Sequence, residues 1–369
     1  MADVLLTPPQ ADEVEISLFG PGYGECVLVH LGNGHWLVND SCTSPSSAGR
    51  MPVALSYLRS IGIAPSEHIR LLVASHWHDD HVSGLSDFAA ECPDAAFVCS
   101  MALRSNEFLQ LIKLAEASRT SLGSGVSELK KIIDFRRNNA TGALVKFAVA
   151  DLPLWKDSES GATVYALSPS DESIAASLQD ISELVDEIAQ YRTKVPPLKP
   201  NAASIVLWVD LGHTRVLLGG DLENHSNSLR GWRGIVSSTT RPAGKAEVYK
   251  VAHHGSITAH CDDIWQKLLQ GENISVIAPW QLGRAALPKD DDLRRISGLS
   301  HETYVTTTAS SALPRQRSKL VMQTMAQATR SWQVRDASPG HIQLRRRADR
   351  PWRVGLSPNA FQVTASGTR

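Results

Sequence analysis

The stretch Ile69-Arg-Leu-Leu-Val-Ala-Ser-His-Trp-His-Asp-Asp-His81 joins an apolar run directly to a cluster of polar side chains. The apolar and β-branched residues at 69–74 predict a buried strand. The string His76-Trp-His-Asp-Asp-His81 then falls at the end of that strand, at a sheet edge. Imidazole and carboxylate groups are suitable ligands for zinc, manganese or iron. Because 13 of the 369 residues are His, an H-x-H-x-D-H string is expected by chance roughly 0.001 times. The stretch therefore predicts a metal site.

Two further apolar runs end in residues of the same chemical types. Residues 214–218 lead into Gly219-Gly-Asp221, and residues 248–252 lead into His253-His-Gly-Ser256. Each string alone is a weak signal, because an aspartate can be a turn residue and paired histidines can lie on the surface. Three strand ends with metal-type ligands in one chain predict that they share one site.

The rest of the chain alternates predicted strands and helices. The segment 14–40 reads as three strands, and apolar residues at helical spacing follow at 51–62. Further helices are expected at 101–136 (with an apolar stripe of Phe108, Leu111, Ile112 and Ala115), 171–191, 264–269 and 290–297. Further strands are expected at 95–99, 144–149, 162–167, 204–209, 214–218, 248–252, 275–279 and 304–307.

Antiparallel strands at both ends of the chain with helices between them predict an α/β fold. We expect an αββα sandwich, in which two sheets pack together with helices outside. One large domain would span residues 14–309, with a helical insertion at about 101–195. A C-terminal extension over residues 310–369 could complete the second sheet.

The composition is that of an ordinary globular protein. Hydrophobic residues make up 42% and charged residues 20% of the chain, which excludes wholesale disorder, collagen and coiled coil. There is no run of 18 apolar residues, and the start lacks the basic and apolar regions of a signal peptide. Five cysteines without a CxxC pair argue against a disulfide framework. We therefore expect a cytoplasmic protein that does not associate with a membrane.

The net charge of −1 hides an asymmetry along the chain. Residues 311–369 carry eleven Lys/Arg and two Asp, a balance of +9, which leaves −10 for the first 310 residues. Arg345, Arg346, Arg347, Arg350 and Arg353 cluster around Trp352. Such a cluster could grip phosphates and stack a base of a nucleic acid. Alternatively, residues 341–344 form a final sheet strand, and the arginines pair with the acidic body of the protein.

The polar strings resemble those of the metallo-β-lactamase-fold hydrolases. Within that superfamily, the chain is most similar to the hydrolase domain of bacterial competence-type DNA-uptake proteins. The H-x-H-x-D-H string is specific to the superfamily, and the G-D and H-H-G-S strings narrow the resemblance to this branch. The matching stretches keep the family's order over about residues 14 to 309 and comprise Phe19–Val29, Leu37–Ser41, Ser75–Leu85, Asn201–Ser204, Val216–Asp221 and Lys250–Ser256.

The resemblance implies two divalent metal ions, with zinc as the first choice and manganese as the alternative. In the family pattern, two histidines bind the first ion, an Asp-His pair and a later histidine bind the second, and one aspartate bridges both. Carried over to this sequence, the ligands are His76 and His78 for the first ion, Asp80, His81 and His254 for the second, and Asp221 for both.

The resemblance also assigns roles around the ions. Either histidine of the pair at 253–254 could be the ligand; we favour His254 and expect His253 to face the substrate. Asp80 and His253 are thus the expected catalytic residues, and Asp40 corresponds to a buried aspartate that orients a ligand histidine. The expected substrate-binding residues are Asn201, Ser204 and Ser256. For the first two, a turn at the start of a strand is an equally good interpretation.

Three features depart from the family pattern. No His occurs between His81 and His213, so the first ion lacks the third histidine that many superfamily members supply. The competence-like branch often lacks it too, and water would then complete this site. Cys42 stands where glycine is usual, and Leu287-Pro288 stands where His-Pro is common. The second replacement would remove a substrate contact or a general acid.

The leading functional hypothesis is a metal-dependent hydrolase that uses a metal-bridged hydroxide, because metal binding lowers the pKa of water from about 15.7 towards about 7. We expect a phosphodiesterase or nuclease, with a phosphodiester substrate that could be a nucleic acid. The first alternative is hydrolysis of a small ester, thioester or lactone on the same ions. The second is a non-catalytic module of a larger assembly that keeps the metal for stability.

Overall fold

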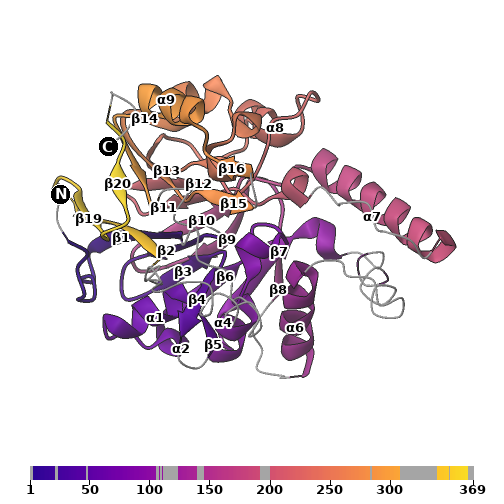
Figure 1. The fold of residues 1–369 in the computed structure, drawn as a ribbon, viewed down its shortest axis with the longest axis horizontal. Helices are drawn as coiled ribbons and strands as arrows, with labels where there is room; N and C mark the ends of the chain where they lie inside the picture. Colours follow the sequence, from indigo (N-terminus) through magenta and orange to yellow (C-terminus); the bar gives the residue numbers. More distant parts are fainter. Residues whose placement is uncertain are drawn as a thin grey trace, which may run out of the picture.

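The computed structural model describes residues 3–20, 24–46, 49–104, 108, 110, 124–138, 145–191, 200–282, 285–307, 339–348 and 350–364. Three members of the expected apolar stripe, Leu111, Ile112 and Ala115, lie outside these residues, as does the extension from 310 to 338. Two eight-stranded sheets pack face to face, and helices cover their outer faces (Figure 1). The predicted αββα sandwich is confirmed.

The first sheet combines an antiparallel edge with a parallel half. The strands β1, β2 and β3 form an antiparallel meander, and β6, β7 and β8 continue parallel to β3. Parallel neighbours need crossover connections, which contain α1 (Val53–Ser60), α4 (Leu85–Glu91) and α6 (Ser124–Asn138). In spatial order the strands are β19 (Arg353–Leu356), β18 (Gly340–Arg347), β1 (Glu13–Gly20), β2 (Cys26–His30), β3 (Trp36–Asn39), β6 (Ile69–Val73), β7 (Ala96–Ser100) and β8 (Val145–Ala148).

The second sheet has the same mixture. Its strands β9 to β12 are antiparallel, whereas β12, β13, β14 and β17 are parallel. The crossovers contain α8 (Gly231–Ser237) and α9 (Asp290–Leu299). In spatial order the strands are β20 (Phe361–Gln362), β17 (Glu302–Val305), β14 (Leu269–Ile277), β13 (Ala246–Lys250), β12 (Arg215–Leu218), β11 (Leu207–Asp210), β10 (Thr163–Ala166) and β9 (Leu152–Lys156).

Alternate residues of the central strands pack on opposite faces. In β2, Val27 and Val29 contribute to the core between the sheets, while Cys26 and Leu28 pack under the outer helices. Strands buried on both faces read as continuous apolar runs because side chains alternate with a period of two. This is why the apolar runs in the sequence predicted buried strands.

The remaining helices and strands lie outside the two large sheets, and some of them carry site residues. The helix α7 (Asp171–Tyr191) has the predicted bounds and points away from the sandwich (Figure 1). The expected helix at 264–269 is instead a short π-helical turn, Ile264–Leu268, and β14 begins directly after it. The remaining elements are β4 (Thr43–Ser46), β5 (Gly49–Pro52), α2 (Pro65–His68), α3 (Asp79–Val82), η1 (Met101–Arg104), η2 (Pro200–Ala203), η3 (Ala252–Gly255), η4 (Ile257–Ala259), β15 (Trp280–Leu282) and β16 (Ala285–Leu287). Among the helices described, none combines the length and apolar character needed to cross a membrane.

The C-terminal segment contributes strands to both sheets. The strand β18 pairs antiparallel with β1, β19 pairs with β18, and only β20 joins the second sheet, beside β17. The expected completion of the second sheet therefore applies to β20, whereas β18 and β19 extend the first sheet.

The arginines of β18 contact acidic side chains of the same chain. Arg345 pairs with Glu15 (2.7 Å), Arg346 with Glu247 (2.6 Å) and Arg347 with Asp12 (2.8 Å). The Arg346 guanidinium also lies over the Trp352 ring, 4.7 Å from its centroid. These are the intramolecular contacts that the second interpretation of the basic cluster predicts.

Candidate metal centre

Three strand ends bring their polar side chains to one edge of the sandwich. The string Ser75–His81 follows β6 of the first sheet, whereas Asp221 follows β12 and the pair His253–His254 follows β13 of the second. A backbone hydrogen bond from Ile205 N to Ser75 O (2.8 Å) joins the two sides. The convergence predicted from three separate strings is therefore present in the structure.

The first ligand group consists of His76, His78 and Asp221. One donor atom from each lies within 4.8 Å of the other two. The His76 Nε2 atom is 3.0 Å from His78 Nδ1 and 3.8 Å from Asp221 Oδ2. Since Ser75 Oγ donates to Asp40 Oδ2 (2.8 Å), it accepts a hydrogen bond from His76 Nδ1 (3.0 Å). This arrangement leaves the lone pair of His76 on Nε2, facing Asp221.

The second ligand group consists of Asp80, His81, His254 and the same Asp221. Asp80 Oδ2 lies 3.8 Å from His81 Nε2 and 3.3 Å from His254 Nε2. The Asp221 carboxylate lies 3.3 Å from His81 Nε2 through Oδ1 and 3.6 Å from His254 Nε2 through Oδ2. Ligand atoms about 2.1 Å from a tetrahedral zinc ion are separated by about 3.4 Å. The spacing of this group therefore suits one tetrahedral ion.

Unpartnered atoms support this interpretation. His81 Nε2, His254 Nε2 and Asp221 Oδ1 are buried, and among the residues that the structure describes none of these atoms has a hydrogen-bond partner. The other nitrogen of each histidine is engaged: His81 Nδ1 contacts Asp40 Oδ2 (2.9 Å), and His254 Nδ1 contacts Ala278 O (2.9 Å). Buried polar atoms almost always have a hydrogen-bond partner. The unpartnered nitrogen and oxygen atoms that face the centre of the group therefore fit the ligands of a divalent cation.

The electrostatics of the group also favour a cation. Burial would raise the pKa of the Asp221 carboxyl, but the imidazoles of His81 and His254 outweigh it and hold this pKa well below the usual value. Burial lowers the pKa of His76 well below its usual value, so this imidazole is neutral. Burial would lower the pKa of His81 and His254 as well, but the neighbouring carboxylates, chiefly Asp221, outweigh it and raise both above the usual value, so these two imidazoles favour the protonated form. A divalent cation would take the place of these protons, because metal ligands must be deprotonated.

The adjacent histidines at 253 and 254 occupy different environments. Both have positive φ angles, 48° and 52°, a strained conformation outside glycine that occurs most often at functional sites. The side chain of His254 is 2% exposed, and its Nε2 faces Asp80 and Asp221. The side chain of His253 is 20% exposed, and its Nε2 is 4.0 Å from Asp221 Oδ2. The geometry thus favours His254 as the ligand and places His253 towards the open side.

The sequence profile of the Metallo-beta-lactamase superfamily matches residues 19–260. The chain belongs to the metallo-beta-lactamase superfamily. Its members are generally metal-dependent hydrolases, in agreement with the ligand groups of this protein. No curated protein matches the chain.

Several solved structures match the chain at low sequence identity. The metallo-beta-lactamase fold protein YhfI from Bacillus subtilis is 13% identical, with a TM-score of 0.41, over 80% of this chain and 95% of its own. The diiron β-hydroxylase CmlA from Streptomyces venezuelae is 15% identical, with a TM-score of 0.35, over 66% of this chain and 35% of its own. A metallo-beta-lactamase from Cronobacter sakazakii is 12% identical, with a TM-score of 0.29, over 60% and 64%. Similarities of this size carry no argument about the substrate.

Other predicted residues of this metallo-beta-lactamase-superfamily protein lie around the ligands. Asp40 Oδ2 lies 2.9 Å from His81 Nδ1, and Asp40 Oδ1 accepts a hydrogen bond from Ser75 N (2.7 Å), so this carboxylate contacts both ends of the Ser75–His81 string. Asn201 Nδ2 is 3.5 Å from His253 Nε2, on the open side. Ser256 accepts a hydrogen bond from Thr258 N (3.3 Å) and thereby stabilises the turn after the paired histidines.

The expected substrate contact at Ser204 is corrected by the structure. This residue is fully buried, and its Oγ accepts a hydrogen bond from Asp221 N (3.0 Å). It also lies against Gly220, whose φ is +50°, at a point where a Cβ on residue 220 would come within 2.6 Å of Ser204 Oγ. Ser204 therefore holds the turn that presents Asp221 and does not reach a substrate.

Three charged residues of the site were missed by sequence reasoning. Glu25 and Lys250 form a fully buried ion pair behind the ligands. Glu223 Oε1 lies 3.1 Å from His253 Nδ1 and accepts a hydrogen bond from Thr258 Oγ1 (2.6 Å). A lysine at the end of an apolar strand is a signal that it needs a buried partner, but nothing in the sequence identifies that partner.

Proposed function

We propose that this protein is a dinuclear metal-dependent phosphodiesterase. The observation that supports the proposal is the position of the buried Asp221 carboxylate, which lies 3.8 Å from His76 Nε2 on one side and 3.3 Å from His81 Nε2 and 3.6 Å from His254 Nε2 on the other. His76 and His78 would hold one ion, Asp80, His81 and His254 the other, and Asp221 both. Divalent ions bound there supply Lewis acidity, which makes water a better nucleophile and polarises a phosphoryl or carbonyl oxygen.

His253 is the side chain best placed to act on the substrate. Its Nδ1 faces Glu223 (3.1 Å) and Thr258 Oγ1 (3.1 Å), which fixes the ring and leaves Nε2 directed at the open side of the ligand groups. From there it would bind a substrate oxygen or transfer a proton to the leaving group. Asn201, beside the same Nε2, would bind the substrate as a hydrogen-bond donor.

A phosphodiester is the substrate class that the resemblance to competence-type DNA-uptake proteins favours. Nucleic acid belongs to this class, and a nuclease is one form of the proposed activity. The proposal does not depend on Arg345, Arg346 and Arg347, because each of these side chains pairs with a carboxylate of the same chain.

Hydrolysis of a small ester, thioester or lactone is the second candidate, and an apolar rim favours it. Trp280 stacks on His254 with ring centroids 6.5 Å apart and planes at 25°. Its cross-strand partner in the β15–β16 hairpin is Leu287, and Leu282 in the same hairpin is 44% exposed. An apolar wall beside a metal ligand suits a substrate with a hydrocarbon group.

Reconstituted protein distinguishes the candidates. Zinc- or manganese-loaded enzyme is expected to hydrolyse bis-p-nitrophenyl phosphate, and tests on DNA and RNA would show whether nucleic acid is accepted. Turnover of thioesters or lactones without phosphodiesters would favour the second candidate. Two bound ions with no turnover on any of these substrates would favour the remaining hypothesis, a non-catalytic module that keeps the metal for stability.

The role of His253 has its own test. His253→Gln is expected to lower kcat by about 100-fold or more, because a positioned acid–base group contributes that much, while the metal content stays at the wild-type level. His213→Gln changes an exposed histidine in the β11–β12 turn and is the matched control, with wild-type kcat. Equal turnover of both variants would remove His253 from the mechanism.

A further inference from the structure

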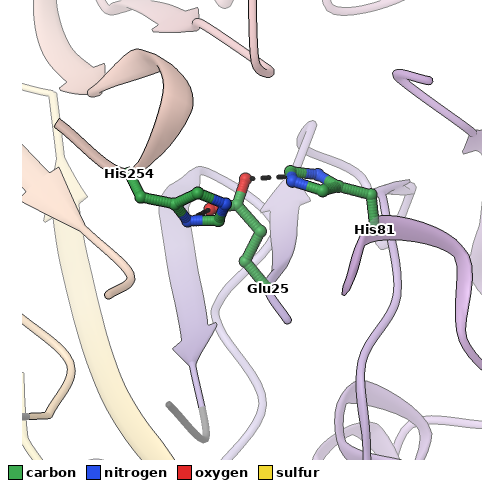
Figure 2. A group of neighbouring side chains, drawn as sticks. All are labelled: Glu25, His81 and His254. Carbon is green, nitrogen blue, oxygen red and sulfur yellow. Dashed lines mark ion pairs between the residues drawn. The ribbon is translucent and has the colours of Figure 1, made fainter. Parts of the chain in front are cut away.

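Glu25 lies behind the second ligand group and faces two of its histidines at once. It is fully buried and immediately precedes β2. Its Oε1 atom is 3.6 Å from His81 Nδ1, and its Oε2 atom is 3.4 Å from His254 Nδ1. Figure 2 shows the carboxylate between the two imidazole rings, with one ion pair drawn to each.

The position of Glu25 is that of a support for the ligands. The Nδ1 atoms that it faces already contact Asp40 Oδ2 and Ala278 O, whereas the unpartnered nitrogens of His81 and His254 are Nε2. The ammonium group of Lys250 forms an ion pair with Glu25 Oε1 and supplies a cation for this carboxylate. An ion of the second group would therefore lie on the opposite side of both rings from Glu25.

Lys250 extends this support to the bridging aspartate. It is the last residue of β13, is fully buried, and donates from Nζ to Gly220 O (3.1 Å). Gly220 is the residue before Asp221 and lies in the turn held by Ser204. The pair thus contacts His81 from the first sheet, His254 from the second, and the turn that presents Asp221.

We propose that the Glu25–Lys250 pair positions the ligands of the second ion across the two sheets. Two charges buried together cost desolvation, and such a pair often adds no net stability compared with apolar side chains of the same volume. Groups that orient metal ligands from behind typically raise metal affinity 10- to 100-fold. The inference rests on the proposed two-ion site and is independent of the proposed substrate.

The decisive variant is the double replacement Glu25→Gln with Lys250→Met. It removes both charges and keeps the volume, whereas either single replacement leaves one buried charge unpaired and is expected to be strongly destabilising. The matched control is Glu15→Gln with Arg345→Met, which removes another buried ion pair (2.7 Å) between β1 and β18. A second test variant, Glu25→Asp, keeps the charge but draws the carboxylate away from the rings.

Metal affinity is measured by competition with a zinc-binding dye, and the ligand field by the absorption spectrum of the cobalt-substituted protein. In the double variant, the Kd of the second ion is expected to rise 10- to 100-fold, whereas the Kd of the first ion should change by less than about 3-fold. The absorption spectrum of the cobalt-substituted variant should differ from that of the wild type. The control is expected to keep both wild-type Kd values and the wild-type spectrum. Glu25→Asp is expected to weaken the second ion in the same direction.

Wild-type affinities at both ions in a folded double variant would overturn the inference. If the double variant does not fold, unchanged affinities in Glu25→Asp would overturn it equally. Wild-type protein that binds two ions but hydrolyses no substrate would contradict the proposed function alone, because both readouts here measure metal binding without turnover.

Discussion

At the scale of single residues, the role of a side chain in this protein depends on what lies behind it. His253 and His254 are adjacent and share a left-handed backbone conformation. Their partners differ, because Ala278 O contacts the ring of His254 and Glu223 contacts the ring of His253. The partner of Nδ1 fixes which nitrogen carries the lone pair and where the ring points. Residue type and spacing therefore identify candidate ligands, while their partners decide between a ligand and a substrate-facing group.

The shared carboxylate gives a prediction about metal content. Asp221→Ala is expected to lose more than one of two bound ions, because this carboxylate lies beside His76 on one side and beside His81 and His254 on the other. Elemental analysis after reconstitution with zinc or manganese and desalting measures the loss. Asp210→Ala is the matched control, since Asp210 pairs with Arg215 at the surface end of β11 and its loss should leave the metal content unchanged. Full metal content in the Asp221 variant would contradict the bridge.

A second prediction concerns pH and the buried histidine of β18. Burial lowers the pKa of His341 from 6.5 to about 3, so the unfolded chain takes up a proton that the folded protein excludes. Its contribution to stability is complete above pH 6.5 and is lost as the pH falls towards 3, at up to about 1.4 kcal/mol per pH unit.

Urea unfolding between pH 7.5 and pH 5, with a chelator present to remove metal effects, tests this. His341→Gln keeps a donor for Ser17 Oγ, which His341 Nε2 contacts at 2.9 Å, and should show a shallower loss of unfolding free energy on acidification. His213→Gln should follow the wild-type curve. Identical slopes for all three proteins would show that His341 does not titrate on unfolding.

At the scale of elements, β18 shows how one strand uses similar residues for different purposes. Arg345 and Arg347 lie two residues apart in a strand paired with β1, yet their side chains are 2% and 53% exposed. Arg345 also joins the N-terminal segment to the sheet through its hydrogen bond to Thr7 O. The basic cluster noticed in the sequence is therefore partly a component of the core.

The difference in burial between Arg345 and Arg347 predicts that their replacement lowers the unfolding free energy by different amounts. Arg345→Ala leaves Glu15 buried and unpaired, which is expected to cost about 3–5 kcal/mol of unfolding free energy. Arg347→Ala breaks only an exposed pair with Asp12 and should cost about 1 kcal/mol or less. Urea unfolding of both variants provides the comparison. Similar losses, or the larger loss in Arg347→Ala, would contradict the assignment of Arg345 to the core.

At the scale of the whole molecule, the site lies where two sheets meet. His76, Asp80 and His81 come from the first sheet, and Asp221 and His254 from the second. A bound ion would therefore connect the halves of the sandwich, and metal binding and stability should be coupled. The shared site also explains why ligands so far apart in sequence are needed together.

This coupling predicts a thermal shift. Saturating zinc is expected to raise Tm by roughly 3 °C or more over chelated protein, because a ligand at 100 times its Kd stabilises the folded state by about 2.7 kcal/mol. Asp221→Ala should lose most of the shift, and Asp210→Ala should keep it. A Tm that does not depend on zinc in the wild type would contradict preferential binding of zinc to the folded protein.

The αββα class, the three strand ends and the chemical types of the ligands could all be predicted from the amino-acid sequence. Buried strands alternate their side chains between two apolar faces and so read as apolar runs, and metal ligands are confined to a few residue types. The helix expected at 264–269 is present as the π-helical turn Ile264–Leu268, and the expectation was wrong only at Leu269, where β14 begins. Leu269 pairs with Ala246 of β13, and this contact between strands determines its conformation, although the spacing of apolar residues along the chain is helical.

The groups that support the ligands and the positions of the C-terminal strands could not be predicted in this way and came from the folded structure. Glu25 and Lys250 are 225 positions apart, and their pairing arises from the packing of two sheets. The addition of β18 and β19 to the first sheet likewise depends on which edge strand is available for pairing, and that strand is β1. Periodicity and motif spacing describe a residue's neighbours along the chain. They carry no information about contacts that form only when distant strands meet, which is why the partners of His81, His253 and His254 had to come from the structure.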